Sequence, residues 1–313
     1  MVKYRTEEGD AASLYKRGQE LVDPSRRSRQ WRKAFGLWSR AAELGHIEAA
    51  FEVAACLDDG LGVARDPEAA FANYMRAAKA GHGLASFNVA CCFEEGRGTK
   101  LNDRFAVKWL RVAARHRVAD ARLNLGVRHF YGEGVRRNMR EAVAYYRQAA
   151  RANSAAACHN LALCYLHGDG VRRNLGHAWR WASKAAEAGD AKANRVRLQI
   201  AMCYRDGDRV RKNHKKAYRL SSELAGLGDA DAMLEVGFCF HSGLGVERDD
   251  EAAVSWYRRG AAAGSAGACF NLALCYSQAQ GVRRNLSIAR AWAKKAVDGR
   301  WQGARALLRQ LAP

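Results

Sequence analysis

A Gly-x-Gly tripeptide that returns every thirty-six residues constrains the fold of this chain more than any other feature. Five copies are complete: Gly60/Gly62, Gly96/Gly98, Gly132/Gly134, Gly168/Gly170 and Gly243/Gly245. Two copies are incomplete, because Arg209 follows Gly207 and Ala279 precedes Gly281. A fixed period in this range is the signature of stacked, near-identical supersecondary units. The period therefore predicts a repeat fold, a class that binds other molecules far more often than it catalyses reactions.

Each repeat predicts two helices, A and B, joined by the glycine loop. Helix A has an aliphatic residue seven positions before the loop, followed by Ala or Gly, and the small residue lets the partner helix approach closely: Val53-Ala54, Val89-Ala90, Leu125-Gly126, Leu161-Ala162, Ile200-Ala201, Val236-Gly237 and Leu272-Ala273. Aromatic or apolar residues follow at helical spacing. The glycines permit the positive φ that ends helix A.

Helix B begins at a recurring Asp or Asn, six residues after the first loop position. These side chains can accept hydrogen bonds from the first free amides of the helix, so we predict that they are N-caps: Asp66, Asn102, Asn138, Asn174, Asn213, Asp249 and Asn285. An alanine follows four residues after each of them. Pro67 stands directly after Asp66, where a helix tolerates proline best.

The repeats predict one all-α domain over residues 1–313. We expect an α-solenoid, a right-handed superhelix of about eight antiparallel helix pairs plus a C-terminal capping helix. Residues 1–45 form an irregular N-terminal unit with helices near 10–22 and 30–44, residues 46–300 form seven repeats, and 301–313 form the cap. Three extra residues within 193–197 are expected to lengthen one helix A or to tilt the stack.

Composition and cysteine placement bear on the compartment. Hydrophobic residues make up 49% of the chain and charged residues 27%, which is typical of a folded soluble protein. No stretch approaches the roughly 20 apolar residues of a membrane span, and the start has no apolar signal region. Six cysteines recur four residues before the loop, at helix-packing distances too long for disulfides: Cys56, Cys92, Cys164, Cys203, Cys239 and Cys275. We expect buried thiols and an intracellular, reducing compartment (cytoplasm or organelle matrix), with no membrane insertion and no secretion.

The repeat resembles that of the Sel-one-like repeat (SLR) family, a relative of the tetratricopeptide repeats. The motif in residues 121–150 is close to a consensus unit: Ala121, Leu125-Gly126, Gly132-Glu133-Gly134-Val135, Asn138, Ala142, Tyr145-Tyr146 and Ala149-Ala150. The resemblance extends from about residue 10 to the end, and the departures at Arg209 and Ala279 bring only the local turns into question. It implies a non-enzymatic adaptor that holds other proteins together in signalling, quality-control or membrane-associated complexes.

Basic residues precede most of the predicted N-caps in a chain of net charge +20. They are Arg65, Lys100, Arg136, Arg137, Arg172, Arg173, Arg211, Lys212, Arg248, Arg283 and Arg284. A cation at a helix N-terminus opposes the macrodipole, so we expect these side chains to add nothing to helix stability. Along one edge of a solenoid, beside free helix amides, they suit an anion. Two interpretations stay open. The residues form a row of basic side chains that binds phosphates or an acidic protein, or they are solvated loop charges.

A second basic cluster lies near the N-terminus, where Arg26, Arg27 and Arg29 precede Trp31 and are followed by Arg32 and Lys33. Such a cluster can grip nucleic acid by charge and stacking. The alternative, which we favour, is a charged loop whose Trp31 packs into the first unit.

A polar column on helix A lies eight residues before the loop. Its members include four asparagines: Asn88, Asn124, Asn160 and Asn271. In the related tetratricopeptide arrays, helix A lines the concave groove and carboxamides there bind an extended peptide backbone, so the resemblance implies a partner-binding groove. The other interpretation is a hydrogen bond to the neighbouring repeat.

Catalytic and metal chemistry find little support in the sequence. Cys158, His159, Cys164 and His167 have metal-ligand side chains, but two of them fall on buried repeat columns, so we predict no zinc site. No cofactor motif and no recurring catalytic set is present, and we predict no cofactor and no small-molecule substrate.

We expect a non-enzymatic scaffold with a protein partner of acidic character. The alternative is a structural subunit or assembly factor of a ribonucleoprotein, such as an organellar ribosome, whose arginines contact RNA. An enzyme or enzyme regulator is the third interpretation.

Overall fold

The computed structural model describes residues 10–22 and 30–311. Within these residues the chain forms seventeen α-helices and no strand, and consecutive helices pack against each other from α1 to α8 and from α10 to α17. The fold is an all-α repeat solenoid, as predicted. The chain divides into two compact units, residues 1–157 with 169–171, and residues 158–168 with 172–313.

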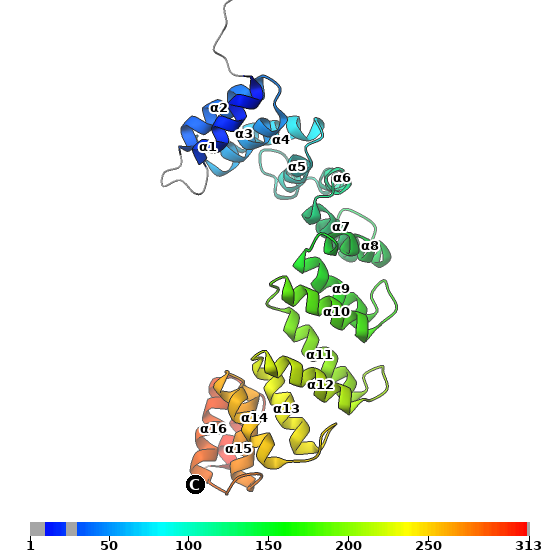
Figure 1. The fold of residues 1–313 in the computed structure, drawn as a ribbon, viewed down its shortest axis with the longest axis vertical. Coiled ribbons are helices and arrows are strands. Elements are labelled where there is room, and N and C mark those ends of the chain that lie inside the picture. Colours follow the sequence, from blue (N-terminus) through cyan, green and yellow to red (C-terminus); the bar gives the residue numbers. More distant parts are fainter. Residues whose placement is uncertain (1–9, 23–29, 312–313) are drawn as a thin grey trace, which may run out of the picture. The chain divides into compact units, whose positions relative to one another are not determined.

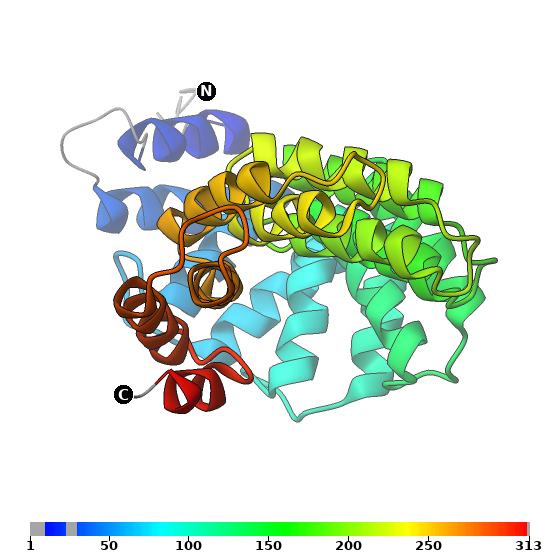
Figure 2. The same ribbon diagram turned by 90° about the horizontal axis from the view of Figure 1, so that it is seen from below.

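The first unit contains four helix pairs, each made of a helix A and a helix B. They are α1 (Ala11–Val22) and α2 (Trp31–Glu43), α3 (Ile47–Asp59) and α4 (Pro67–Lys79), α5 (Gly83–Glu95) and α6 (Asp103–Arg115), and α7 (Ala119–Tyr131) and α8 (Met139–Ala150) (Figure 1). The blue helices α1 and α2 lie side by side in both views (Figures 1 and 2), which agrees with their packing.

Helix α9 (Ala155–His167) begins in the first unit, and most of it belongs to the second. The helices that follow it are α10 (Leu175–Glu187), α11 (Ala193–Asp206), α12 (His214–Gly226), α13 (Ala230–Ser242), α14 (Asp250–Ala262), α15 (Ala266–Gln278), α16 (Leu286–Asp298) and α17 (Ala304–Gln310). The short α17 packs Leu307 against Ala289 and Ala293 of α16.

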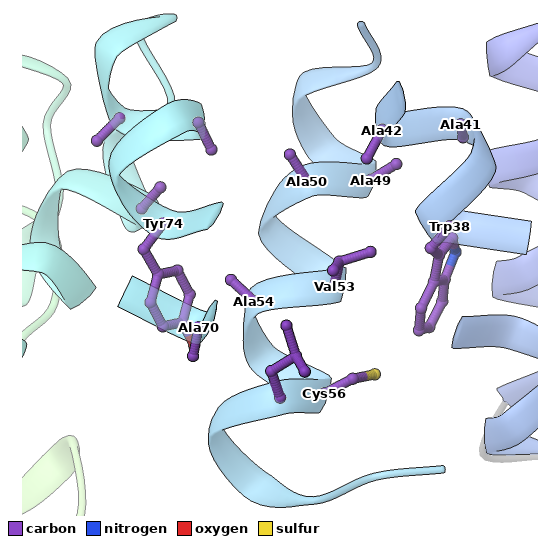
Figure 3. Packing of buried hydrophobic residues seen from close by; sticks show 14 of the residues in the cluster. Trp38, Ala41, Ala42, Ala49, Ala50, Val53, Ala54, Cys56, Ala70 and Tyr74 are labelled. Carbon is purple, nitrogen blue, oxygen red and sulfur yellow. The ribbon is translucent and has the colours of Figure 1, made fainter. Parts of the chain in front are cut away.

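The core consists of small residues on helix A that face large residues on the neighbouring helices B. Figure 3 shows α3 between two such helices, with Trp38 of α2 opposite Val53 and Tyr74 of α4 opposite Ala54. At two equivalent positions in other repeats the small residue is glycine. A Cβ added to Gly237 would lie 2.5 Å from the ring of Tyr257, so the predicted close approach of the two helices is confirmed.

Two irregularities of the sequence are absorbed locally. Helix α11 has 14 residues where the other helices A from α3 to α15 have 13, so one of the three extra residues lengthens the helix. The other two lie in the turn before it, where Asp190 Oδ1 accepts from the Lys192 amide at 3.0 Å. The incomplete glycine turns keep their geometry, because Arg209 and Ala279 adopt positive φ values of 52° and 60°.

Candidate functional site

The loop between helix A and helix B is held by hydrogen bonds at both of its ends. All seven predicted N-caps are confirmed, since each Asp or Asn side chain accepts from an amide in the first turn of helix B. The backbone amide of each cap also donates back to a carbonyl in the last turns of helix A, as Asn138 does to His129 at 2.8 Å. The residues just before the caps are therefore held close to the end of helix A.

This geometry corrects the expectation that the basic residues before the caps add nothing to helix stability. In four loops the arginine directly before the cap donates from Nε to a helix A carbonyl seven residues earlier, at 2.7–3.2 Å: Arg65 to Asp58, Arg137 to Phe130, Arg173 to Leu166 and Arg284 to Ser277. The last carbonyls of a helix have no intrahelical partner and carry the negative end of the dipole. The cation opposes the start of helix B but caps the end of helix A.

The first residue of each basic pair, two positions before the cap, does not cap helix A. Arg136, Arg172, Arg211 and Arg283 are exposed, and no hydrogen bond or ion pair of their side chains occurs within the described ranges. Lys212 is exposed as well. Arg173, by contrast, also binds the carboxylate of Asp208 at 3.0 Å. The predicted basic positions thus include a capping set, a free set, and Arg248, which binds the carboxylate of Asp250 at 2.8 Å.

The N-terminal basic cluster is only partly visible. Arg26, Arg27 and Arg29 lie outside the described residues. Trp31 is half-buried, packs on the core of the first helix pairs, and meets Trp38 with ring centroids 6.4 Å apart. The favoured interpretation, in which Trp31 packs into the first unit, is confirmed.

The asparagine column is half-buried and two of its members bind within the protein. Asn88 is hydrogen-bonded to Tyr74 of the preceding helix B, and Asn271 is bonded in the same way to Tyr257. The equivalent of these tyrosines beside Asn124 is Leu110, which has no polar group. The intramolecular interpretation therefore holds for Asn88 and Asn271, while partner binding by Asn124 and Asn160 stays a prediction.

A hollow of about 520 Å³ in the second unit is lined mainly by helices A, and it includes two residues of this column, Asn271 and Glu235. Leu234 and Phe238 of α13 line it together with Asn271 of α15 and Trp301, whose side chain is exposed. Glu235 also lines it and is paired with Arg205. Burial raises the pKa of Glu235, and the nearby Arg205 opposes the rise. This mixed apolar and polar wall has the chemistry of a surface that can hold a peptide.

The cysteines are structural. All nine are free thiols, and the six of the repeat column are buried as predicted. Burial raises the pKa of Cys56 to about 12 and that of Cys92 to about 11, so these thiols carry almost no thiolate at neutral pH. Of the four residues whose side chains could bind a metal, His159 forms a hydrogen bond between its Nδ1 and Asp190 Oδ2 at 2.6 Å. None of the described helices is long and apolar enough to cross a bilayer.

Ion pairs join neighbouring repeats, and they were not predicted from the sequence. Arg128 on α7 is buried and binds Glu94 of α5 at 2.8 Å and Asp103 of α6 at 3.2 Å. Arg97, in the loop after α5, and Asp58 of α3 form a similar pair. A signal was present for two of these pairs, because Arg128 and Glu94 lie 34 residues apart in the sequence and Arg97 and Asp58 lie 39 apart, about one repeat in each case.

Comparisons with known proteins agree with this geometry. A family model described as the Sel1 repeat matches eight segments: 12–46, 47–82, 83–117, 119–154, 155–190, 197–229, 230–265 and 266–299. No match was found among curated protein sequences. The fold is similar to that of a protective antigen of uropathogenic Escherichia coli with an SLR fold, at 28% identity and a TM-score of 0.76. The alignment covers 97% of this chain but 65% of that one, less than two thirds of its length. It is also similar to a Sel1 repeat protein from Oxalobacter formigenes, at 26% identity and a TM-score of 0.67 over 97% of this chain and 87% of that one.

Proposed function

Because this chain belongs to the Sel1 repeat family, whose members generally mediate protein–protein interactions, we propose that it is a non-catalytic scaffold for an acidic protein partner. The family membership supports the protein partner. The acidic character of that partner rests on the charges of the chain itself, which sum to +20.

The observation that carries the proposal is the division within the arginine pairs. In three loops the second arginine is used by the fold, as a cap on helix A, while the first is exposed and unpaired among the described residues. The free arginine stands two residues before the N-cap of helix B, where a negative group is also favoured by the helix amides. Removing the free arginines should therefore leave the fold intact and weaken the binding of acidic partners.

RNA phosphates are the alternative ligand for the same arginines, in a ribonucleoprotein subunit such as one of an organellar ribosome. The compartment proposed for either function is intracellular and reducing, the cytoplasm or an organelle matrix, because the cysteines are free thiols.

The test is affinity purification of the tagged full chain from a lysate of its own organism, with and without nuclease. A variant with Arg136, Arg172, Arg211 and Arg283 changed to Gln should lose acidic proteins from the eluate. A control variant changes four exposed basic residues away from the loops to Gln and should retain them: Lys79, Arg195, Lys294 and Arg305.

Unchanged recovery of the same partners by the loop variant would refute the acidic-partner proposal. Loss of the partners on nuclease treatment, together with co-elution of RNA, would instead favour the ribonucleoprotein alternative. The two variants carry the same net charge, so a difference between them reports the position of the charge and not its total.

A further inference from the structure

Helix α6 in the first unit carries a stripe of four basic residues. Arg104, Lys108, Arg111 and Arg115 follow one another at intervals of four, three and four residues, so they lie on one face of the helix. All four are exposed, and their side chains form no ion pair or hydrogen bond in the described structure. At the equivalent positions α8 has three basic residues, and every other helix B has two or fewer.

The stripe forms one wall of a pocket of about 870 Å³. The opposite wall is the loop from α7 to α8 with the first turn of α8, which contributes Arg136, Arg137 and Glu141. Six basic side chains thus line the pocket with a single carboxylate, that of Glu141. The aliphatic side chains of the lining are Val107, Val112 and Val135.

A buried histidine completes the lining. The side chain of His129 is 8% exposed, and its ring nitrogens form no hydrogen bond with another side chain in the described residues. Its ring stacks on Tyr145 with centroids 5.5 Å apart, and Nε2 lies 3.6 Å from Oε2 of Glu141. Burial lowers the pKa of His129, Glu141 partly offsets this, Arg111 lowers it again, and a hydrogen bond with the backbone of Arg136 raises it.

Five of these six basic side chains form no hydrogen bond or ion pair within the described residues, while Arg137 caps the end of α7. Like charges on one helix face destabilise the helix, and the concave wall adds the charges of the loop to those of the stripe. A ligand with several negative charges would relieve this repulsion. The aliphatic residues of the lining would pack against apolar groups, so the ligand should also carry apolar groups between its negative charges.

We propose that this pocket binds an acidic segment of a protein partner, in which Asp or Glu alternates with aliphatic residues. The assignment rests on the proposed scaffold function. The stripe is about 16 Å long at 1.5 Å per residue of helix, a length that about five residues of extended chain span. A single-stranded nucleic acid is a poorer fit, because no Phe, Tyr or Trp of the described chain lines the pocket to stack on bases.

The experiment measures fluorescence anisotropy of a labelled eight-residue peptide of alternating Glu and Val, added to the full-length protein in 50 mM salt. The variant Arg111→Glu/Arg115→Glu should raise the dissociation constant about tenfold or more, and 300 mM salt should weaken binding to the unaltered protein. The matched control is Lys79→Glu/Lys294→Glu. Lys79 is the equivalent of Arg115 on α4 and Lys294 that of Arg111 on α16, and this variant should bind within about twofold of the unaltered protein. Circular dichroism of both variants shows that they fold.

Two results would overturn the assignment. One is no binding of the peptide in 50 mM salt, or an equal loss in both variants. The other is tighter binding of an eight-nucleotide oligouridylate that is lost in the α6 variant, which would assign the pocket to RNA. If acidic proteins still co-purify with the α6 variant, the pocket assignment alone fails. If no acidic protein co-purifies with the unaltered chain, the scaffold proposal fails whatever the peptide does.

Discussion

The two glycines of a single loop should tolerate alanine very differently. Gly243 and Gly245 both adopt positive φ, at 65° and 80°. An added Cβ at Gly243 would meet nothing closer than the Arg248 side chain at 3.6 Å, whereas at Gly245 it would lie 2.3 Å from the carbonyl oxygen of His214. His214 is the first residue of α12, in the preceding repeat. The second glycine therefore allows two repeats to stack, and the first only ends a helix.

The magnitudes follow from these contacts. An L-residue at positive φ costs about 1–2 kcal/mol. The lower backbone freedom of alanine in the unfolded chain offsets about 0.4–1 kcal/mol of this. Gly243→Ala should therefore lower the free energy of unfolding by about 1 kcal/mol, in agreement with the alanine already present at the equivalent position, Ala279. Gly245→Ala adds overpacking against a backbone, about 1–3 kcal/mol, for a total of about 2–4 kcal/mol.

The assay is urea unfolding followed by far-ultraviolet circular dichroism at 25 °C, with midpoints compared at a common slope. The midpoint of Gly245→Ala should fall at least twice as far as that of Gly243→Ala. Equal shifts for the two variants would refute the reasoning, because they would mean that positive φ alone sets the cost and that the close contact between repeats does not matter.

Three further outcomes are expected, and each is measured by the urea midpoint. Asn285→Ala should lower the free energy of unfolding by about 1 kcal/mol through loss of the N-cap of α16, and Asn285→Asp should not; equal loss in both would contradict the capping role. Arg284→Met should lower the free energy of unfolding by up to about 1 kcal/mol through loss of the cap on α15, while Arg283→Met should leave the midpoint unchanged. A larger loss in Arg283→Met than in Arg284→Met would contradict the different roles of the two arginines. Burial raises the pKa of Cys239 to about 11 in the folded protein, against roughly 8.5 in an unfolded chain. The neutral thiol therefore contributes its full stability below about pH 8.5, and this contribution is lost as the pH rises toward 11. Cys239→Ala should weaken the decline of the midpoint between pH 8.5 and 11, and an identical pH profile in this variant would contradict the assignment.

Much of the fold could be predicted from the sequence because its determinants are local. An N-cap such as Asn174 and a helix-ending glycine such as Gly168 act within a few residues of their own position, so the spacing of residue types locates them. The same holds for the small residue at Gly237, since it recurs once per repeat and faces a large residue at a fixed offset.

The roles of the basic residues could not be predicted in the same way. Arg137 precedes a helix start in the sequence, but the turn brings its Nε to the carbonyl of Phe130 at the end of the other helix, and only the folded turn shows this. The stripe on α6 was overlooked for a different reason. Aligning the repeats draws attention to what they share, whereas this stripe is informative because no other helix B has basic residues at all four positions.

The ion pairs between repeats have a consequence for how the chain acquires its structure. The partners of Arg97, Arg128 and Arg205 lie 39, 34 and 30 residues away in the sequence, so the tertiary bonds join near neighbours along the chain. Folding can then start in several hairpins independently and spread by docking of adjacent ones, without waiting for distant segments to meet. Pulse-labelling hydrogen exchange during refolding should detect early protection in more than one hairpin, and protection that always began in the same single hairpin would contradict this expectation.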